Sequence, residues 1–395
     1  MSRILITGLG IISAIGDNAA TNRQSLTQGR SGIGHSDLLQ SRYASILPFG
    51  EIKINTTDLK EKLGAKEPGI TRTELLALHA FEEAIVDSQL TETEIRSPRT
   101  ALVGATTVGG MCLTDELYHD ANKQDQGSEY LSSYDCGSVN IYLQKRYQIN
   151  GIINTINTAC SSSANAIMYG ARLIRHGLAD RAIVGGVDSL AKFTINGFNS
   201  LHILSNELCA PFDENRKGLN LGEAAAFLVL EKEEAMGNKT KYATLTGYGN
   251  SNDAFHPSSL SDNGDGPFLA MQEALTIANL SPEKIDYVNA HGTGTENNDL
   301  SESTAMIRLF GNPPPFSSTK AYTGHTLGAA GAIEAVFSIL SLYNGELYAG
   351  IHFDKPIPTT GLRPILSYEK KEICHVMSNS FGFGGNCSSL IFSKA

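Results

Sequence analysis

Several features that would assign the chain to a common functional class are missing from it. Its six cysteines include no CxxC pair, and no group of Cys and His has zinc-site spacing. The formal net charge is −10 and the pI is about 5.5, which argues against nucleic acid as the main partner but leaves an acidic carrier possible. No apolar run is long enough to span a membrane, and the N-terminus has no basic leader. We therefore expect a cytoplasmic protein with reduced thiols.

A dinucleotide-binding loop is also missing. Gly8 and Gly10 follow a short strand at residues 3–7, but the spacing to Gly16 is wrong and no acidic residue ends a following strand. What the 395 residues do show is strands alternating with buried helices in both halves, which predicts an α/β fold. The expected strands include residues 100–105, 181–187, 226–231, 243–249 and 285–290, and the expected helices include 71–88, 267–278 and 327–342.

One stretch, residues 154–176, dominates the sequence. A β-rich run leads into Cys160, three serines follow, and small or apolar residues then recur at helical spacing up to Gly177. Serines favour the start of a helix, so Cys160 is expected where a strand turns into a buried helix. There the helix N-terminus favours a thiolate, and free backbone N–H groups can bind an oxyanion. A buried structural cysteine is the competing interpretation.

Two histidines lie at the edges of elements instead of within apolar periodicity. His291 ends a predicted strand, and His325 precedes a predicted helix. Active sites of open α/β sheets collect at the carboxyl ends of strands, so both could meet Cys160. Taken alone, one Cys with two His allows a protease, a metal site, an acyl-transfer enzyme or a non-enzymatic scaffold.

Five motifs carry a specific resemblance that covers essentially the whole chain. In order they are TACSSSANAI, PFDENRKGLNLGEAAAFLVLE, NAHGTGTENND, STKAYTGHTLGAAGAIEA and NSFGFGGN. The chain resembles the elongating β-ketoacyl-[acyl-carrier-protein] synthases, ketosynthases of the thiolase-fold condensing-enzyme family. The resemblance implies a thiolase-like fold with two related α/β halves, residues 1–245 with the nucleophile and 246–395 with the two histidines, in five α-β-α-β-α layers.

The resemblance also implies a role for each matched position. Cys160 would take the acyl chain, and His291 and His325 would bind the malonyl thioester carbonyl and assist its decarboxylation. The other implied residues are Lys320 and Glu334 in the supporting network, Thr293 and Thr295 at the pantetheine arm, Phe383 as the gate, the Cys160 and Phe383 amides as the oxyanion hole, and Val108 at the acyl chain. The implied partners are an acyl carrier protein, whose phosphopantetheine holds the substrates, and a second chain in a dimer. Neither a metal nor another cofactor is expected.

Related classes differ at particular residues. A degradative thiolase uses a second cysteine as a base, and Cys387 after Gly385 is the candidate. The initiating synthases resemble a Cys-His-Asn arrangement, against which His291 argues. Chain-length factors lack the nucleophile, whereas Cys160 is present. The sequence leaves open a homodimer or a heterodimer with a chain-length factor, a catalytically silent scaffold that docks a carrier, and the choice among fatty acid, polyene and polyketide pathways.

Overall fold

The computed structural model describes residues 3–123, 128 and 130–395. Ten strands form two groups of five. The first group is β1 (Ile4–Ser13), β4 (Thr100–Ala105), β5 (Ile153–Ile156), β6 (Arg181–Asp188) and β7 (Ala224–Lys232). The second group is β8 (Ala243–Asn252), β9 (Tyr287–Asn289), β10 (Phe316–Ser317), β13 (His375–Phe381) and β14 (Asn386–Ser393).

The two groups have the same topology. Their spatial orders are β5-β4-β6-β7-β1 and β10-β9-β13-β14-β8, which is the same order when the strands of each group are numbered along the chain. In each group the first three strands of this order pair in parallel and the other pairings are antiparallel. The groups join through short pairing of β1 with β8, at Leu5–Thr244 and Ile6–Ala243. The chain thus has two related halves, as the resemblance implies.

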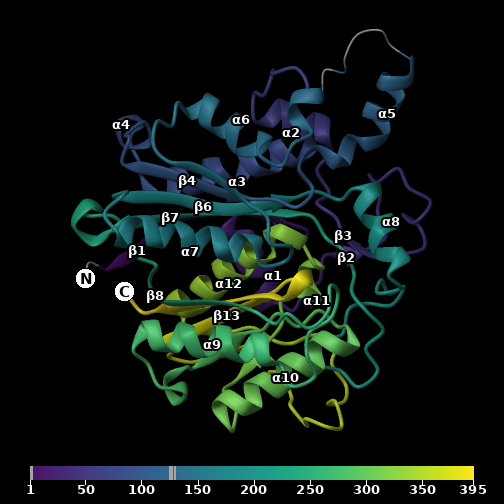
Figure 1. The fold of residues 1–395 in the computed structure, drawn as a ribbon, viewed down its shortest axis with the longest axis vertical. Coiled ribbons are helices and arrows are strands. Elements are labelled where there is room, and N and C mark those ends of the chain that lie inside the picture. The colour runs from purple at the N-terminus through teal and green to yellow at the C-terminus, as the bar shows by residue number, and fades with distance from the viewer. Residues whose placement is uncertain (1–2, 124–127, 129) are drawn as a thin grey trace.

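Helices complete five layers (Figure 1). Two central helices, α7 (Ser162–Arg175) and α12 (Ala330–Asn344), pack between the sheets. The outer face of the first sheet is covered by α3 (Arg72–Ser88) and α6 (Ser138–Tyr147). The outer face of the second is covered by α9 (Asp265–Ala278), on which α10 (Glu296–Phe310) packs. The α-β-α-β-α order is confirmed.

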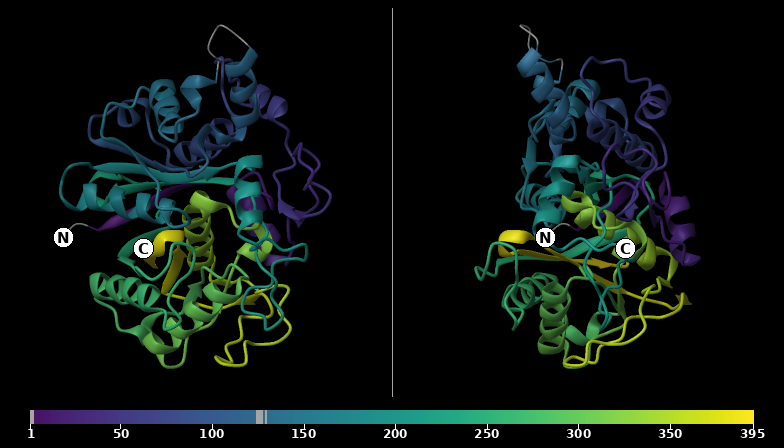
Figure 2. Two further views of the ribbon diagram at one scale, coloured as in Figure 1. Left: turned by 45° about the vertical axis from the view of Figure 1, so that its right-hand side comes forward. Right: turned by 90° about the vertical axis from the view of Figure 1, so that its right-hand side faces the viewer.

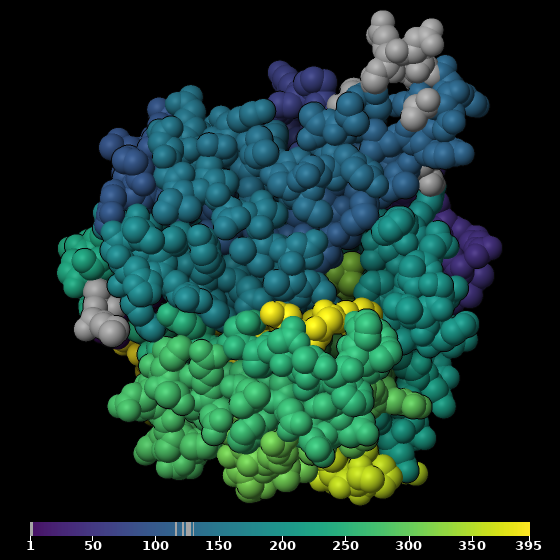
Figure 3. All heavy atoms as spheres, in the orientation of Figure 1, coloured from purple at the N-terminus to yellow at the C-terminus, as the bar shows by residue number. Residues whose placement is uncertain are grey.

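Other views show the same division. In Figure 2 the blue layers stay above the green-to-yellow layers in both orientations, and purple N-terminal segments reach down to the middle of the molecule. The space-filling view of Figure 3 shows C-terminal residues, in yellow, emerging between the two halves. The remaining elements are α1 (Ala19–Thr27), β2 (Ile33–Gly34), β3 (Phe49–Gly50), α2 (Thr56–Lys62), α4 (Glu92–Ile95), α5 (Thr114–Lys123), α8 (Lys192–Ser200), α11 (Lys320–Thr323), β11 (Glu346–Leu347), β12 (Glu369–Lys370) and several short 3₁₀ turns.

The central helices approach closely because small residues face each other. A Cβ at Gly331 of α12 would lie 2.6 Å from the backbone nitrogen of Ala164 in α7, and one at Gly170 would lie 2.3 Å from Val184 in the first sheet. Larger residues there would separate the helices. This contact brings the N-terminal ends of α7 and α12 together, and with them the segments that carry Cys160 and His325.

Helix α12 also corrects one expectation. Within the described part of the chain, Leu327–Asn344 is a helical stretch long and apolar enough to pass a membrane-span test, and 89% of it is buried inside the protein. The expectation that no run reaches this length and apolarity is wrong. The stretch is apolar all round because both sheets and α7 surround it.

Local patterns missed some boundaries and elements. Strand β1 was expected to end at residue 7, but it continues through Gly8 and Gly10 to Ser13. Glycine is needed there because a Cβ at Gly10 would lie 2.0 Å from the Ala80 carbonyl oxygen of α3. Helices α2, α6 and α10 were not among the expected helices.

Candidate active site

Cys160 lies between β5 and α7 and is 5% exposed. The preceding Ala159 has φ +55°, a left-handed conformation that is costly for a residue with a Cβ. Ser161 caps the helix by position, yet its hydroxyl makes no capping bond. It donates instead to the Thr158 carbonyl oxygen and to Asn386 Oδ1. The expected turn exists, but contacts with the second half hold it.

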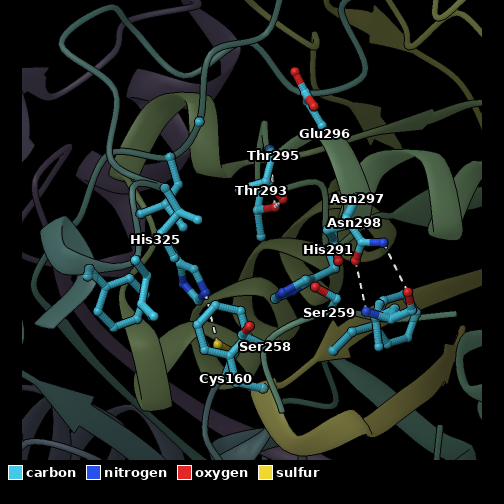
Figure 4. Close-up of a pocket in the computed structure, with 18 of the residues that line it drawn as sticks. Cys160, Ser258, Ser259, His291, Thr293, Thr295, Glu296, Asn297, Asn298 and His325 are labelled. Atoms are coloured by element: carbon cyan, nitrogen blue, oxygen red, sulfur yellow. Dashed lines mark hydrogen bonds between the residues drawn. The ribbon is translucent and has the colours of Figure 1, made fainter. Parts of the chain in front are cut away.

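The second half supplies both predicted histidines. His291 follows β9, and His325 follows α11. His325 Nε2 lies 3.1 Å from Cys160 Sγ, and the two imidazole rings are 5.4 Å apart and nearly perpendicular. Figure 4 shows both rings turned toward the cysteine. Residues separated by more than 100 positions thus share one buried site.

Hydrogen bonds fix the tautomers of both imidazoles. The Leu327 backbone N–H donates to His325 Nδ1 over 3.2 Å, so the His325 proton lies on Nε2. The Lys320 ammonium, which can only donate, lies 3.1 Å from His291 Nδ1, so that proton also lies on Nε2. Two neutral imidazoles therefore present N–H donors to the space above Cys160. This is the arrangement needed to stabilise charge on a carbonyl oxygen.

Lys320 connects the histidines to a buried acid. Its ammonium donates to the Glu334 carboxylate and, over 2.6 Å, to the His291 carbonyl oxygen. Lys320 and Glu334 are each 2% exposed. Burial raises the pKa of Glu334 to about 7, against the opposing effect of Lys320. Lys320 thus places a positive charge beside His291, and the Glu334 carboxylate offsets much of that charge.

The electrostatics keep both imidazoles neutral. Burial, reinforced by the charge of Lys320, lowers the pKa of His291 and of His325 well below the ordinary value. Burial also raises the pKa of the Cys160 thiol to about 11, although Lys320 and the amides of Phe383 and Cys160 itself act in the opposite direction. These are the two amides that the resemblance assigns to the oxyanion hole.

Removing the charge of Lys320 should destabilise the fold strongly. We expect Lys320→Met to cost about 3–5 kcal/mol, because it leaves the Glu334 carboxylate buried without its cation, beside the Ser380 hydroxyl at 3.4 Å. The double variant Lys320→Met/Glu334→Gln should recover much of this loss. Urea unfolding followed by circular dichroism measures both changes. A double variant no more stable than the single one would contradict this account of the pair.

Two cavities meet at Cys160. The larger, about 490 Å³, extends from Cys160 past both histidines to Thr293 and Thr295, whose hydroxyl oxygens are 2.8 Å apart. Figure 4 shows these threonines above the histidines. The second, about 370 Å³, is mainly apolar. Its lining residues include Thr107, Met111, Cys160, Phe193, Phe198, Leu327 and Phe383.

Two stacked phenylalanines stand where the cavities meet. The rings of Phe198 and Phe383 are 5.8 Å apart and inclined by 18°, and both residues line both cavities. Phe383 was expected here, whereas Phe198 was not. Val108 lines neither cavity among the described contacts; it is 1% exposed and belongs to the buried apolar cluster that includes Leu327. The structure therefore does not place Val108 at the surface of either cavity, and its role at the acyl chain stays a prediction.

Sequence reasoning missed several supporting groups. Glu302, fully buried, accepts the backbone N–H groups of His291 and Gly292 over 2.9 and 2.8 Å, and burial raises its pKa to about 7. His202, which lies outside the five motifs, lines the larger cavity. The only sequence signal for Glu302 was its spacing of 11 residues from His291; in the structure it lies in α10, which begins at Glu296.

The thiolase-like alternative receives no support from the position of Cys387. Its side chain is fully buried, its thiol donates to the Gly385 carbonyl oxygen, and it lines neither cavity. Cys160, His291 and His325 each offer an atom within 4.8 Å of the others, which is close enough for a metal ion. In the tautomers described above, however, the two Nε2 atoms carry protons and have no lone pair to give.

Comparisons with known proteins agree with this architecture. Family models named Beta-ketoacyl synthase, N-terminal domain, and Beta-ketoacyl synthase, C-terminal domain, match residues 1–235 and 242–354. The 3-oxoacyl-[acyl-carrier-protein] synthase 2 of Staphylococcus aureus is 34% identical over 417 residues, 99% of this chain and 98% of that protein.

Solved structures extend the likeness to three dimensions. A chain from the complex of ketosynthase ApeO with its chain length factor ApeC, from Xenorhabdus doucetiae, is 34% identical, with a TM-score of 0.87 over 100% of this chain and 98% of that one. A chain from AntDE:AntF, a type II polyketide synthase acyl-carrier protein in complex with its ketosynthase, is 25% identical, with a TM-score of 0.89 and full coverage of both.

The fold and the site together define a condensing enzyme of the acyltransferase class, with one thiol and two imidazoles at the junction of two α/β halves. The family matches cover both halves. The chain belongs to the beta-ketoacyl synthase family.

Proposed function

We propose that this protein condenses an acyl chain held on Cys160 with a malonyl group held on an acyl carrier protein. The observation that carries the proposal is the meeting of Cys160 Sγ with two Nε2–H donors, one only 3.1 Å away, in a single cavity. The relatives named as 3-oxoacyl-[acyl-carrier-protein] synthases support it.

The first step is acyl transfer. The Cys160 sulfur attacks the acyl thioester, the carbon–sulfur bond to the carrier breaks, and the carrier thiol leaves with the proton. The amides of Cys160 and Phe383 would hold the tetrahedral oxyanion, and both act to lower the pKa of the Cys160 thiol. The acyl chain would then occupy the apolar cavity of about 370 Å³ that begins at Cys160.

The second step begins with loss of CO2. The malonyl thioester oxygen would accept from Nε2–H of His291 and His325 while the bond to the carboxylate breaks and its electron pair forms an enolate. The enolate carbon attacks the acyl-Cys160 carbonyl, a carbon–carbon bond forms, and the Cys160 thiolate leaves. Thr293 and Thr295 would position the pantetheine arm in the larger cavity that they line. Within these steps, Lys320 and Glu334 orient His291.

We further propose that the molecule is a dimer formed along β5. This strand lies at one end of the sheet, pairs with β4 alone among the described strands, and is only partly buried. The preceding Ile152 is 37% exposed. An unpaired edge strand is a template for another strand. The partner would be a second copy or a chain-length factor, and the mass of the purified assembly distinguishes the two.

The division at residue 245 is likewise proposed as functional. Residues 1–245 would supply the nucleophile and 246–395 the imidazoles. The first strand of the second group, β8, begins slightly before this boundary, at Ala243. The cytoplasmic location and the lack of a metal or redox cofactor stay predictions from the sequence.

The decisive assay uses purified acyl and malonyl carriers. We expect mass spectrometry to find an acyl adduct on Cys160 and a β-ketoacyl product two carbons longer, with release of CO2. An acyl-mimicking electrophile should modify Cys160 in the native protein. If neither label nor product forms with any carrier, the protein is a docking scaffold and the enzyme proposal is wrong.

Phe383→Ala should separate the two steps. We expect acyl loading of Cys160 to fall at least about tenfold, because one ring of the stacked pair between the cavities is lost, while malonyl decarboxylation changes less. Loading and CO2 release are measured separately with single carriers. Phe255→Ala, at a ring that is 59% exposed and lines neither cavity, is the control. Equal losses in both steps would argue against a gate.

A further inference from the structure

The carboxylate of Asp188 is buried at the end of β6 without a cation. Its side chain is 0% exposed, and no Lys, Arg or His side chain pairs with it in the described part of the chain. A buried carboxylate is costly unless hydrogen bonds satisfy it. The groups that do so show which segments Asp188 holds in place.

Five donors from two segments surround this carboxylate. Oδ1 accepts from the Thr106 hydroxyl and the Thr107 and Val108 amides over 2.6–2.9 Å. Oδ2 accepts from the Thr107 hydroxyl over 2.6 Å and the Gly328 amide over 2.7 Å. Asp188 therefore joins the loop after β4 to the turn before α12.

The turn before α12 is strained and reaches the catalytic histidine. Leu327 has φ +53°, which is unfavourable for a residue with a Cβ. Its amide donates to His325 Nδ1, and the next amide, of Gly328, donates to Asp188. Two consecutive N–H groups are thus held by His325 on one side and Asp188 on the other. Leu327 and Thr107 also line the apolar cavity at Cys160.

We propose that Asp188 is a positioning residue: by holding the Leu327 turn it keeps His325 in the Nε2–H tautomer, and by holding Thr107 it fixes the wall of the acyl cavity. This inference rests on the proposed function and adds a residue to it. Asp188 touches no reacting atom; it acts through Leu327 and Thr107.

The hydrogen bonds of Asp188 to the loop after β4 and to the turn before α12, which we call the Asp188 clamp, have a chemical consequence at Cys160. Because the Leu327 N–H points at Nδ1, His325 has no place there for a second proton and cannot form an imidazolium that pairs with a Cys160 thiolate. The charged groups facing this pair are Lys320 and Glu334, with neutral His291 beside them. Burial raises the pKa of the thiol to about 11, so the thiol should alkylate slowly at neutral pH. The alkylation rate should rise about tenfold for each unit by which the pH is increased toward this pKa.

Asp188→Asn tests the clamp with a side chain of equal size. An amide nitrogen in the place of Oδ2 would bring two hydrogen-bond donors, its own N–H and that of Gly328, against each other. The loss of this hydrogen bond would release the Leu327 turn. Freed His325 could then take the Cys160 proton. We expect the pH profile of Cys160 alkylation by iodoacetamide to move at least one unit to lower pH, and malonyl decarboxylation to fall at least tenfold.

Asp286→Asn is the matched control. Its carboxylate also accepts two backbone N–H groups, of Cys374 and His375, but at the start of β9, the end remote from His291. We expect the wild-type alkylation profile and decarboxylation rate. If Asp188→Asn does not fold, Gly328→Ala gives the same readouts, because its Cβ would lie 2.9 Å from Asp188 Oδ2.

A wild-type alkylation profile in a folded Asp188→Asn or Gly328→Ala variant overturns the clamp. Equal effects of Asp188→Asn and Asp286→Asn would reduce Asp188 to a general stabilising role and overturn it too. Failure of the proposed function is a separate result: wild-type protein would release no CO2 from malonyl carrier, yet the alkylation profiles of the variants would still decide the clamp.

Discussion

Cys160→Gln should abolish condensation, by about 10⁴-fold or more, while decarboxylation of the malonyl carrier continues or rises. Loss of the nucleophile removes the covalent step entirely. The two Nε2–H donors do not depend on the thiol for their tautomers, since Leu327 and Lys320 set them from the other side of each ring. The glutamine side chain would also fill the site as an acyl group does. Product mass spectrometry and CO2 release measure the two activities.

Cys387→Ala serves as the control for removing a buried thiol. This residue is as buried as Cys160 but bonds only to the Gly385 carbonyl oxygen, away from both cavities. We expect condensation to persist in it. If Cys160→Gln still condenses, or if it no longer decarboxylates malonyl carrier, then the proposal that the sulfur serves condensation and the imidazoles serve decarboxylation is wrong.

His291→Ala should have the opposite effect. We expect decarboxylation to fall by about 10²–10³-fold, because one of two fixed donors to the developing enolate oxygen is lost. Acyl loading of Cys160 should change little, since His325, and not His291, contacts the sulfur. Loading is followed by protein mass spectrometry with acyl carrier alone, and decarboxylation by CO2 release with malonyl carrier alone.

His375→Ala is the matched histidine control. His375 begins β13, is partly buried, and bonds to Ser393, far along the strand from the site. It should leave both activities near the wild-type level. If His291→Ala loses loading and decarboxylation in equal measure, His291 supports the structure of the whole site and is not a donor to the enolate.

Much of the fold was readable from local patterns. The strand at residues 100–105 and the helices at 71–88 and 267–278 have the expected periodicity, and the structure places β4, α3 and α9 there. Helix α10 was missed because its buried face is largely polar: Asn298, Asp299, Ser301 and Glu302 are all buried. Asp299 and Glu302 accept backbone N–H groups from the loop after β9, so their burial follows from tertiary contacts and not from hydrophobicity.

The residues of the site also fall into those that the sequence indicated and those that only the structure revealed. Cys160, His291 and His325 stood out because each carries reactive chemistry in an unusual local context, and Lys320 was indicated by the resemblance alone. Asp188 and Phe198 did not, because an acid after a strand and a phenylalanine in a helix are ordinary in any α/β protein. Their importance comes from partners up to 185 positions away, such as the Phe383 ring stacked on Phe198.

By itself the sequence determined the alternation of strands and helices, the position of a thiol at a strand–helix turn and the two candidate imidazoles, because periodicity and residue type are local properties. Only the tertiary structure decided which ring nitrogen faces the sulfur, how Lys320 is neutralised and what holds the turn before α12. The His325 tautomer depends on the left-handed turn at Leu327, and Asp188 and Glu334 reach that turn and Lys320 from other segments, so the local patterns did not reveal these contacts.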